Sequence, residues 1–312
     1  MKKNGLLLLC VFFTLTSLSQ QNDSVPFFKM CNDVQITLDI PAHYRPGKKT
    51  LLILYALPNG NSTAQTMGKK MKANDDWHFD IQHIKAQTEF IRNELKKKNI
   101  VVAYLENTFK SWPTWKAKHP AYISEVRRIV DTLYRMFPAN NTSICLNGHS
   151  GGGRFIFSYL DGVKSIPKYI ERIVFLDSDY GYEASYGKQL QLWLQENKKT
   201  ELHVFAYNDS IALYQGKRIV SDTGGTWYRS HLMLKDLSAF FHFNITGDGS
   251  LSIYRSSNRR IGFYFKSNPE RKIFHTTQVE LNGFIHSVLA GTNRESVNYE
   301  YYGERAYEAF IK

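Results

Sequence analysis

The stretch NGHSGGGRF, residues 147–155, follows the apolar run Ser143–Leu146 and precedes a segment of helical character. Each glycine inside a helix costs about 0.5–1 kcal/mol relative to alanine, so three in a row need a reason. A very sharp strand-to-helix turn at Ser150 would explain the glycines. In such a turn, side chains two residues before and two residues after the serine would collide with each other. Gly148 and Gly152 have no Cβ and avoid that collision. The pattern Gly-x-Ser-x-Gly therefore predicts a strained, exposed serine between a strand and a helix.

The rest of this turn also has chemical consequences. The backbone amide of Gly151, at the start of the expected helix, would point toward a negative charge that develops beside the serine. Gly153 is only partly explained, either by close packing of the helix on the sheet or by room for a substrate. The turn thus predicts a nucleophilic serine with one hydrogen-bond donor for an oxyanion.

Apolar runs of strand length alternate along the chain with stretches of helical period. Continuous apolar runs indicate strands buried on both faces, as in parallel sheets. The runs are residues 50–55, 100–105, 143–146, 172–176 and 202–206, and the helical stretches are residues 81–97, 122–137 and 183–198. The alternation predicts an α/β fold with a mostly parallel central sheet and helices on both faces.

Two regions depart from this rhythm. Residues 34–40 alternate between apolar and polar and predict an antiparallel edge strand. Residues 211–266 are mixed, with strand-like pieces at 240–245 and 261–265. We expect an inserted lid or antiparallel region around residues 211–260, within a single domain that spans residues 21–312.

The N-terminus has the features of a secretory signal peptide over residues 1–20. Lys2 and Lys3 precede an apolar run that is too short to span a membrane, and Ser17 and Ser19 supply small residues for cleavage. Cys10 does not fit a lipoprotein anchor, so we expect a secreted or periplasmic protein without a transmembrane segment. Of the remaining cysteines, Cys145 lies in an apolar run and favours a buried free thiol, although its pairing with Cys31 stays open.

The charge of the chain limits its partners. The formal net charge is +12, and loss of Lys2 and Lys3 with the signal peptide lowers it by two. A basic protein attracts polyanions such as acidic polysaccharides. No nucleic-acid-binding motif, phosphate loop or dinucleotide fingerprint is present, and the spacing of His78 and His83 is poor for a metal site. We expect no cofactor and no metal.

The glycine-serine turn resembles the nucleophile elbow of the α/β-hydrolase family. This resemblance implies a catalytic acid and a histidine that follow the serine in chain order. Asp209, just past the run 202–206, is the favoured acid, and Asp177 and Asp179 are its alternatives. His286, after the turn signal Asn282-Gly283, is the favoured base, and His275 is its alternative.

The resemblance also places other site residues. A second oxyanion donor is expected in the loop Leu57–Asn61, where Pro58 has no amide hydrogen and Asn59 or Gly60 would donate instead.

Exposed aromatic planes suit sugar rings, and a cation suits an acidic substrate. The candidate substrate-binding residues are His149, Trp112, Trp115, Trp227 and Arg229.

These features favour an exported serine hydrolase that cleaves carboxylic esters, including esters linked to carbohydrates. Two alternatives remain at this stage. The Gly-x-Ser-x-Gly-Gly pattern also resembles serine peptidases and amidases, and the unusual oxyanion loop would suit a non-catalytic glycan-binding protein on a hydrolase fold. The acyl and alcohol groups of a substrate are set by loop shape, which the sequence does not specify.

Overall fold

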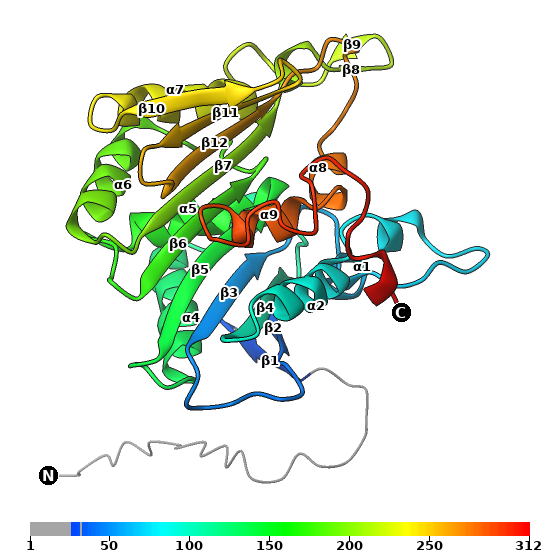
Figure 1. Ribbon diagram of the computed structural model, residues 1–312. Coiled ribbons are helices and arrows are strands. Elements are labelled where there is room, and N and C mark those ends of the chain that lie inside the picture. The colour runs from blue at the N-terminus through cyan, green and yellow to red at the C-terminus, as the bar shows by residue number, and fades with distance from the viewer. Residues whose placement is uncertain (1–25, 32) are drawn as a thin grey trace, which may run out of the picture.

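The computed structural model describes residues 26–31 and 33–312, and one ten-stranded sheet runs through it (Figure 1). The expected signal peptide lies outside the described residues. The strand order is β1-β2-β4-β3-β5-β6-β7-β12-β11-β10. Among the described residues, no helix has the length and apolar character needed to cross a bilayer.

Six neighbouring strands at the centre of the sheet run parallel. They are β4 (Asn99–Asn107), β3 (Thr50–Ala56), β5 (Thr142–His149), β6 (Ile170–Leu176), β7 (Glu201–Tyr207) and β12 (Ile261–Lys266). The first five coincide with the apolar runs, because strands covered on both faces expose almost no side chain. The predicted mostly parallel sheet is confirmed.

The outer strands are antiparallel. β2 (Val34–Asp39) is antiparallel to its neighbour β4, as predicted for residues 34–40, but it is not an edge strand, because β1 (Phe27–Met30) pairs with its other side. At the opposite end, β11 (Leu251–Ser256) and β10 (Phe243–Gly247) extend the sheet beyond β12.

The region 211–260 was expected to be an inserted lid or an antiparallel region, and the antiparallel alternative is confirmed, because β11 and β10 extend the main sheet as antiparallel strands. The region also holds helix α7 (Thr226–Ser238) and a small hairpin of β8 (Leu213–Tyr214) and β9 (Lys217–Arg218), which forms a separate two-stranded sheet. The strand expected at residues 261–265 is β12, which is parallel to β7 and belongs to the central sheet.

Helices cover both faces of the sheet and divide the core into two clusters (Figure 1). One cluster lies under α3 (Trp112–Lys118), α4 (Tyr122–Arg135), α5 (Gly153–Asp161), α6 (Ala184–Glu196) and α7. The other lies under α2 (Ile84–Glu94) and α9 (Gly283–Leu289), with the short helices α1 (Thr63–Met67) and α8 (Thr277–Glu280) nearby.

Helix α4 illustrates how the sequence pattern becomes a packed face. Val126, Ile129, Val130 and Leu133 recur at helical spacing and are fully buried, whereas Ile123, which begins the same pattern, is 41% exposed. Within the described residues, the cysteines Cys31 and Cys145 are both buried and free. The free thiol predicted for Cys145 is confirmed, and burial raises its pKa to about 12.

Candidate active site

The glycine-serine turn lies at the carboxyl end of β5, near the middle of the sheet. The strand ends at His149, a 3₁₀ turn covers Ser150–Gly152, and α5 begins at Gly153. Ser150 has a φ of 54°, in the left-handed region that a side chain rarely occupies. Such a strained backbone at a loop tip is a frequent feature of functional sites. The sharp turn expected at this serine is present.

The glycines of the turn are explained by close approaches of backbone atoms. A Cβ on Gly148 would lie 2.8 Å from the carbonyl carbon of Gly152, and one on Gly152 would lie 2.1 Å from the Ala56 oxygen. A Cβ on Gly153 would lie only 1.7 Å from the carbonyl oxygen of Ser178. The third glycine therefore lets the loop after β6 pack directly on the first turn of α5.

The register of the parallel strands β5 and β6 places Asp177 beside the serine. His149 and Leu176 are paired in the parallel strands β5 and β6, so Ser150 and Asp177 are the next residue on each strand. Asp177 also has a positive φ, 46°, and its side chain is fully buried. The Nδ1–H of His275 donates a hydrogen bond to Asp177 Oδ2. The structure thus pairs the alternative acid, Asp177, with the alternative base, His275.

His275 is in the loop between β12 and α8, and its side chain remains 24% exposed. The loop is held by Asn268, whose amide nitrogen donates to the carbonyl oxygens of Asn208, at 3.0 Å, and Lys272, at 2.7 Å. His149 Nε2 donates to the carbonyl oxygen of His275 at 2.9 Å, and the two imidazole rings are 4.6 Å apart. These contacts fix the backbone that carries His275 beside the end of β5.

His149 was expected to contact a substrate, but the structure gives it a different position. Its side chain is 1% exposed and burial lowers its pKa well below the ordinary value, so the ring is neutral. A neutral ring that donates to the His275 carbonyl supports the loop from inside the protein.

Asp209 does not contact His275 or His286 among the described residues. Its carboxylate accepts hydrogen bonds from the backbone amides of Thr226, at 2.8 Å, and Trp227, at 3.3 Å, at the start of α7. Burial and the neighbouring charge of Asp177 raise the pKa of Asp209 to about 6. Asp209, the favoured acid, therefore binds the N-terminus of a helix.

Thr226 connects this carboxylate with Asp177. Its hydroxyl donates to Asp177 Oδ1 and lies 3.3 Å from Asp209 Oδ2. Asp179, the other alternative acid, is fully buried, accepts a hydrogen bond from the Ser230 hydroxyl at 2.8 Å, and has its pKa raised well above the ordinary value by burial. Of the three aspartates, Asp177 is the one bonded to a histidine.

His286, the favoured base, lies inside helix α9 rather than in a loop. It is 3% exposed, and its Nδ1 is hydrogen-bonded with the Tyr299 hydroxyl at 2.9 Å. Its ring stacks on Tyr301 at 5.1 Å, and burial lowers its pKa to about 4. The Asn282-Gly283 signal that suggested a loop is the start of the helix, where Asn282 has a left-handed backbone.

A cavity of about 250 Å³ opens beside the serine. It is lined by Asn59, Pro113, Ser150, Gly151, Arg154, Ser178, Tyr180 and Gly181. Asn59 packs so closely on Gly151 that a Cβ there would lie 2.0 Å from Asn59 Oδ1. The amide of Gly60 donates to the carbonyl oxygen of Lys110 at 2.8 Å, so Gly60 is not free to donate to an oxyanion. Asn59 is the one of the two loop candidates that lines the cavity.

The aromatic and cationic candidates lie elsewhere. Trp112 and Trp115 are 2% and 0% exposed, because they pack with Phe155 under α5, so they are core residues and do not present a surface to sugars. Trp227, in the first turn of α7, packs against Phe265 of β12. The Arg229 guanidinium donates to the Tyr182 carbonyl oxygen at 2.9 Å. Trp227 and Arg229, which were expected to bind a substrate, are in the first turn of α7 and do not line the cavity beside Ser150.

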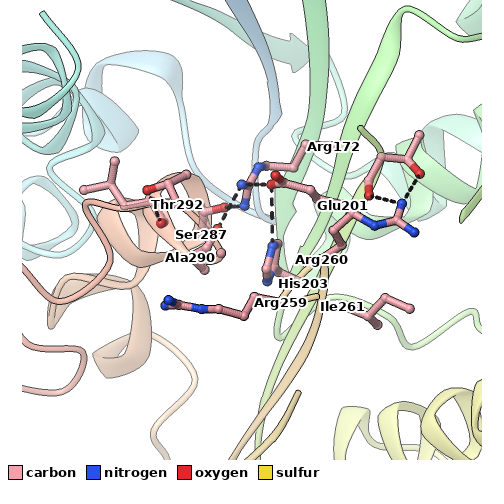
Figure 2. Close-up of polar contacts among 12 residues, drawn as sticks. Arg172, Glu201, His203, Arg259, Arg260, Ile261, Ser287, Ala290 and Thr292 are labelled. Atoms are coloured by element: carbon pink, nitrogen blue, oxygen red, sulfur yellow. Dashed lines mark hydrogen bonds and ion pairs between the residues drawn. The ribbon is translucent and has the colours of Figure 1, made fainter. Parts of the chain in front are cut away.

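A second buried polar cluster lies in the amino-terminal halves of β6 and β7 (Figure 2). We call Arg172, Glu201 and His203 the amino-end cluster. The Arg172 guanidinium donates to Glu201 and to the carbonyl oxygens of Ser287, at 3.0 Å, and Ala290, at 2.9 Å. His203 Nε2 lies 3.8 Å from Glu201 Oε2, and burial lowers the His203 pKa well below its ordinary value.

The strand order, the parallel centre and the serine on the turn after β5 define the α/β-hydrolase fold. No protein-family model matches the chain, and no curated protein matches its sequence. Among solved structures, the chain is similar to a thermostable esterase, with 12% sequence identity, a TM-score of 0.50, and coverage of 86% of this chain and 62% of that chain. The chain thus spans less than two thirds of that esterase.

Two further solved structures are similar at a lower score. The feruloyl esterase module from Clostridium thermocellum has 11% identity and a TM-score of 0.46, with coverage of 82% of this chain and 86% of that chain. An acetyl xylan esterase from Aspergillus awamori has 7% identity and a TM-score of 0.43, with coverage of 78% and 92%. At these identities the similarity concerns the fold.

Proposed function

We propose that the protein is a serine hydrolase that cleaves carboxylic esters, with Ser150 as nucleophile, His275 as general base and Asp177 as the acid that orients it. The observation that carries this proposal is the hydrogen bond between His275 Nδ1 and the buried carboxylate of Asp177. Asp177 directly follows β6 and Ser150 directly follows β5, and the last residues of these two strands are paired. The bond leaves Nε2 as the nitrogen available to the serine hydroxyl.

The reaction would proceed through an acyl-enzyme. Ser150 Oγ attacks the ester carbonyl carbon while His275 Nε2 takes the hydroxyl proton, and the Asp177 carboxylate stabilises the imidazolium that forms. The backbone amides of Gly151 and Asn59 donate to the oxyanion. His275 then protonates the departing alcohol, and a water activated by the same imidazole releases the acid.

The roles of the other carboxylate and histidine follow from their contacts. Asp209 holds the start of α7, and through Thr226 this helix supports Asp177. His286 belongs to the core between α9 and the sheet, where Tyr299 and Tyr301 surround it. We propose that neither takes part in the chemistry.

We propose that the protein is exported and acts on small esters, among them esters linked to carbohydrates. The signal-like residues 1–20 support export. The net charge, +12 for the full chain and lower by two after loss of Lys2 and Lys3, supports attraction to acidic polysaccharides. The solved esterases with this fold support ester cleavage. Trp112 and Trp115 give no support for sugar binding, because they are buried.

The test is hydrolysis of 4-nitrophenyl acetate, acetylated and feruloylated sugars, and matched peptide amides by the purified protein. We expect turnover of esters and a loss of at least about 10³-fold in kcat for Ser150→Ala. Ser185→Ala, on the exposed start of α6, is the matched control. Turnover of amides alone would favour a peptidase, and binding of sugars without turnover would favour a non-catalytic protein.

A further inference from the structure

Arg154 is the second residue of α5 and lines the same cavity as Ser150. Because both side chains line one cavity of about 250 Å³, a small molecule in that cavity can contact them together. Its side chain is partly buried.

The cavity offers this cation no opposite charge. The other seven lining residues are uncharged: Asn59, Pro113, Ser150, Gly151, Ser178, Tyr180 and Gly181. Among the described residues, no ion pair or side-chain hydrogen bond joins the Arg154 guanidinium to another residue, whereas Arg172 and Arg229 both donate to carbonyl oxygens. The guanidinium is therefore free to pair with a ligand of opposite charge that enters the cavity.

The guanidinium is nevertheless held in a defined place. A Cβ on Gly181 would lie 2.8 Å from both Nη1 and Nη2 of Arg154 and 2.9 Å from Cζ. The planar group thus lies against the backbone at Gly181 and stays in the cavity without a hydrogen bond. Because Gly153 lets the loop after β6 pack on α5, the same close approach brings Ser178–Gly181 to this side of the serine.

We propose that Arg154 selects esters that carry a carboxylate group a few bonds from the scissile carbonyl. This proposal rests on the proposed serine hydrolase function. The guanidinium fork matches a carboxylate with two parallel N–H donors, and the N-terminus of α5 adds a favourable field for an anion. The carboxylate is bound and does not react, so the steps at Ser150, His275 and Asp177 are unchanged.

The test compares charged and neutral esters of similar shape. Monoethyl glutarate and ethyl hexanoate place the charge on the acyl side, and 3-acetoxypropanoate and propyl acetate place it on the alcohol side. We expect the wild-type kcat/KM to favour the charged member of one pair by about ten- to a hundredfold, the size expected for a charge-assisted hydrogen bond. The favoured pair then identifies the side of the ester that faces Arg154.

Three variants assign this preference to the guanidinium. Arg154→Met should reduce the ratio of charged to neutral kcat/KM to about one, and Arg154→Lys should restore part of it because charge remains without the fork. Gly181→Ala should lower the ratio by displacing the guanidinium. Arg127→Met, on the exposed part of α4, removes the same charge and should leave the ratio at the wild-type value.

A binding measurement separates failure of this proposal from failure of the proposed function. Glutarate should bind Ser150→Ala protein in calorimetry, and the additional change Arg154→Met should weaken that binding at least about tenfold. A wild-type preference for neutral esters in both pairs, or glutarate binding that does not change with Arg154→Met, would overturn the proposal. Absence of ester turnover with Arg154-dependent glutarate binding would instead contradict the hydrolase function and leave the anion site supported.

Discussion

Two histidine-carboxylate clusters occupy opposite halves of the same sheet, and they differ in what surrounds them. At the carboxyl end, His275 bonds with Asp177 in a loop and keeps 24% of its side chain exposed. In the amino-end cluster, His203 is fully buried near Glu201, and Arg172 is bound by backbone carbonyls of the segment around α9. The same residue types thus form an accessible pair at one end and a closed network at the other.

The difference arises from how parallel strands begin and end. At their carboxyl ends β5 and β6 pass into residues with left-handed backbone, Ser150 and Asp177, and into the first turn of α5. Positive φ values and a free helix N-terminus leave polar groups that a substrate can reach. At the amino ends, Glu201 and two backbone carbonyl oxygens accept hydrogen bonds from Arg172, whereas the two ring nitrogens of the buried His203 have no hydrogen-bond partner among the described residues. We therefore expect substitutions at the carboxyl end to reduce activity and substitutions in the amino-end cluster to reduce stability.

The largest expected effect is the loss of His275. His275→Ala should lower kcat for ester hydrolysis by about 10³–10⁴-fold, because the serine loses its proton acceptor. The measurement is steady-state turnover of 4-nitrophenyl acetate by protein whose folding is checked by circular dichroism.

His286→Phe is the matched comparison for that variant. The aromatic ring keeps the packing on Tyr301, and we expect kcat per folded molecule within about threefold of wild type, although the lost bond to Tyr299 costs about 1 kcal/mol. Equal losses of kcat in the two variants would contradict the distinction between the two histidines.

The next effect concerns stability alone. Arg172→Met should lower the free energy of unfolding by about 3 kcal/mol, since it leaves Glu201 and two carbonyl oxygens without their donor. The measurement is urea denaturation followed by fluorescence, with kcat determined for the folded fraction. Arg127→Met, which removes an exposed ion pair with Asp131, serves as control and should cost less than about 1 kcal/mol. A wild-type denaturation midpoint for Arg172→Met would contradict a structural role for this cluster.

Asp209 gives a pH-dependent effect. Its pKa of about 6 lies above the ordinary value, so between about pH 4 and 6 the folded state holds a proton that the unfolded state has lost. The stability that comes from this bound proton is fully present below pH 4 and is lost as the pH rises through 6. Asparagine does not ionise, so the free energy of unfolding of Asp209→Asn should rise by on the order of 2 kcal/mol relative to that of wild type between pH 4 and pH 7.5.

The control for Asp209→Asn is a variant that removes a carboxylate exposed to solvent. Asp222→Asn changes an 81% exposed side chain and controls for the loss of one carboxylate at the protein surface. Denaturation midpoints of the three proteins at pH 4, 5, 6 and 7.5 supply the data. A flat difference for Asp209→Asn would show that this carboxyl group ionises in the folded protein as it does in water.

The smallest expected effect is at Thr226, which is hydrogen-bonded both to Asp177 of the proposed site and to the structural carboxylate of Asp209. Thr226→Val removes the hydroxyl that donates to Asp177 while the backbone amide still donates to Asp209. We expect kcat to fall about tenfold, the equivalent of one hydrogen bond, with KM unchanged because the residue does not line the cavity. Thr226→Ser should restore the rate. A change in KM alone would place Thr226 in substrate binding instead.

Much of the fold was predictable, because periodicity and apolar content decide which segments are buried. Continuous apolar runs marked β3, β4, β5, β6 and β7, and the glycine pattern marked the turn at Ser150. The antiparallel strands at both ends were harder, since β1 is only 4 residues long and none of its residues is fully buried, and β10 is largely exposed. The parallel pairing of β12 with β7 depends on contacts far apart in the sequence.

The partners of Ser150 could be restricted to a few residues but not ranked correctly. Chain order admits each aspartate after β6 or β7 and each later histidine, and local sequence does not say which side chain faces the serine. The Asn282-Gly283 pair is a turn signal and also a helix start, so His286 could not be distinguished from a loop residue. The pairing of His149 with Leu176 puts Asp177 beside Ser150, and register of this kind is a property of the folded sheet.

Arg154 was missed for a related reason. An arginine in the first turn of a helix is common on protein surfaces, and the sequence does not show that the loop after β6 packs beside it. The one signal was Gly153 together with Gly181, because two glycines without an evident turn role indicate a close approach of two segments.

The measurement that tests the central claim most directly is the rate of covalent labelling of Ser150 by a fluorophosphonate, with the modified residue located by mass spectrometry. Wild-type protein, His275→Ala, and His286→Phe are compared under the same conditions. We predict a single adduct on Ser150, a labelling rate at least about 10²-fold lower for His275→Ala, and a nearly wild-type rate for His286→Phe. Rapid labelling of Ser150 in His275→Ala, together with slow labelling in His286→Phe, would contradict the proposed site.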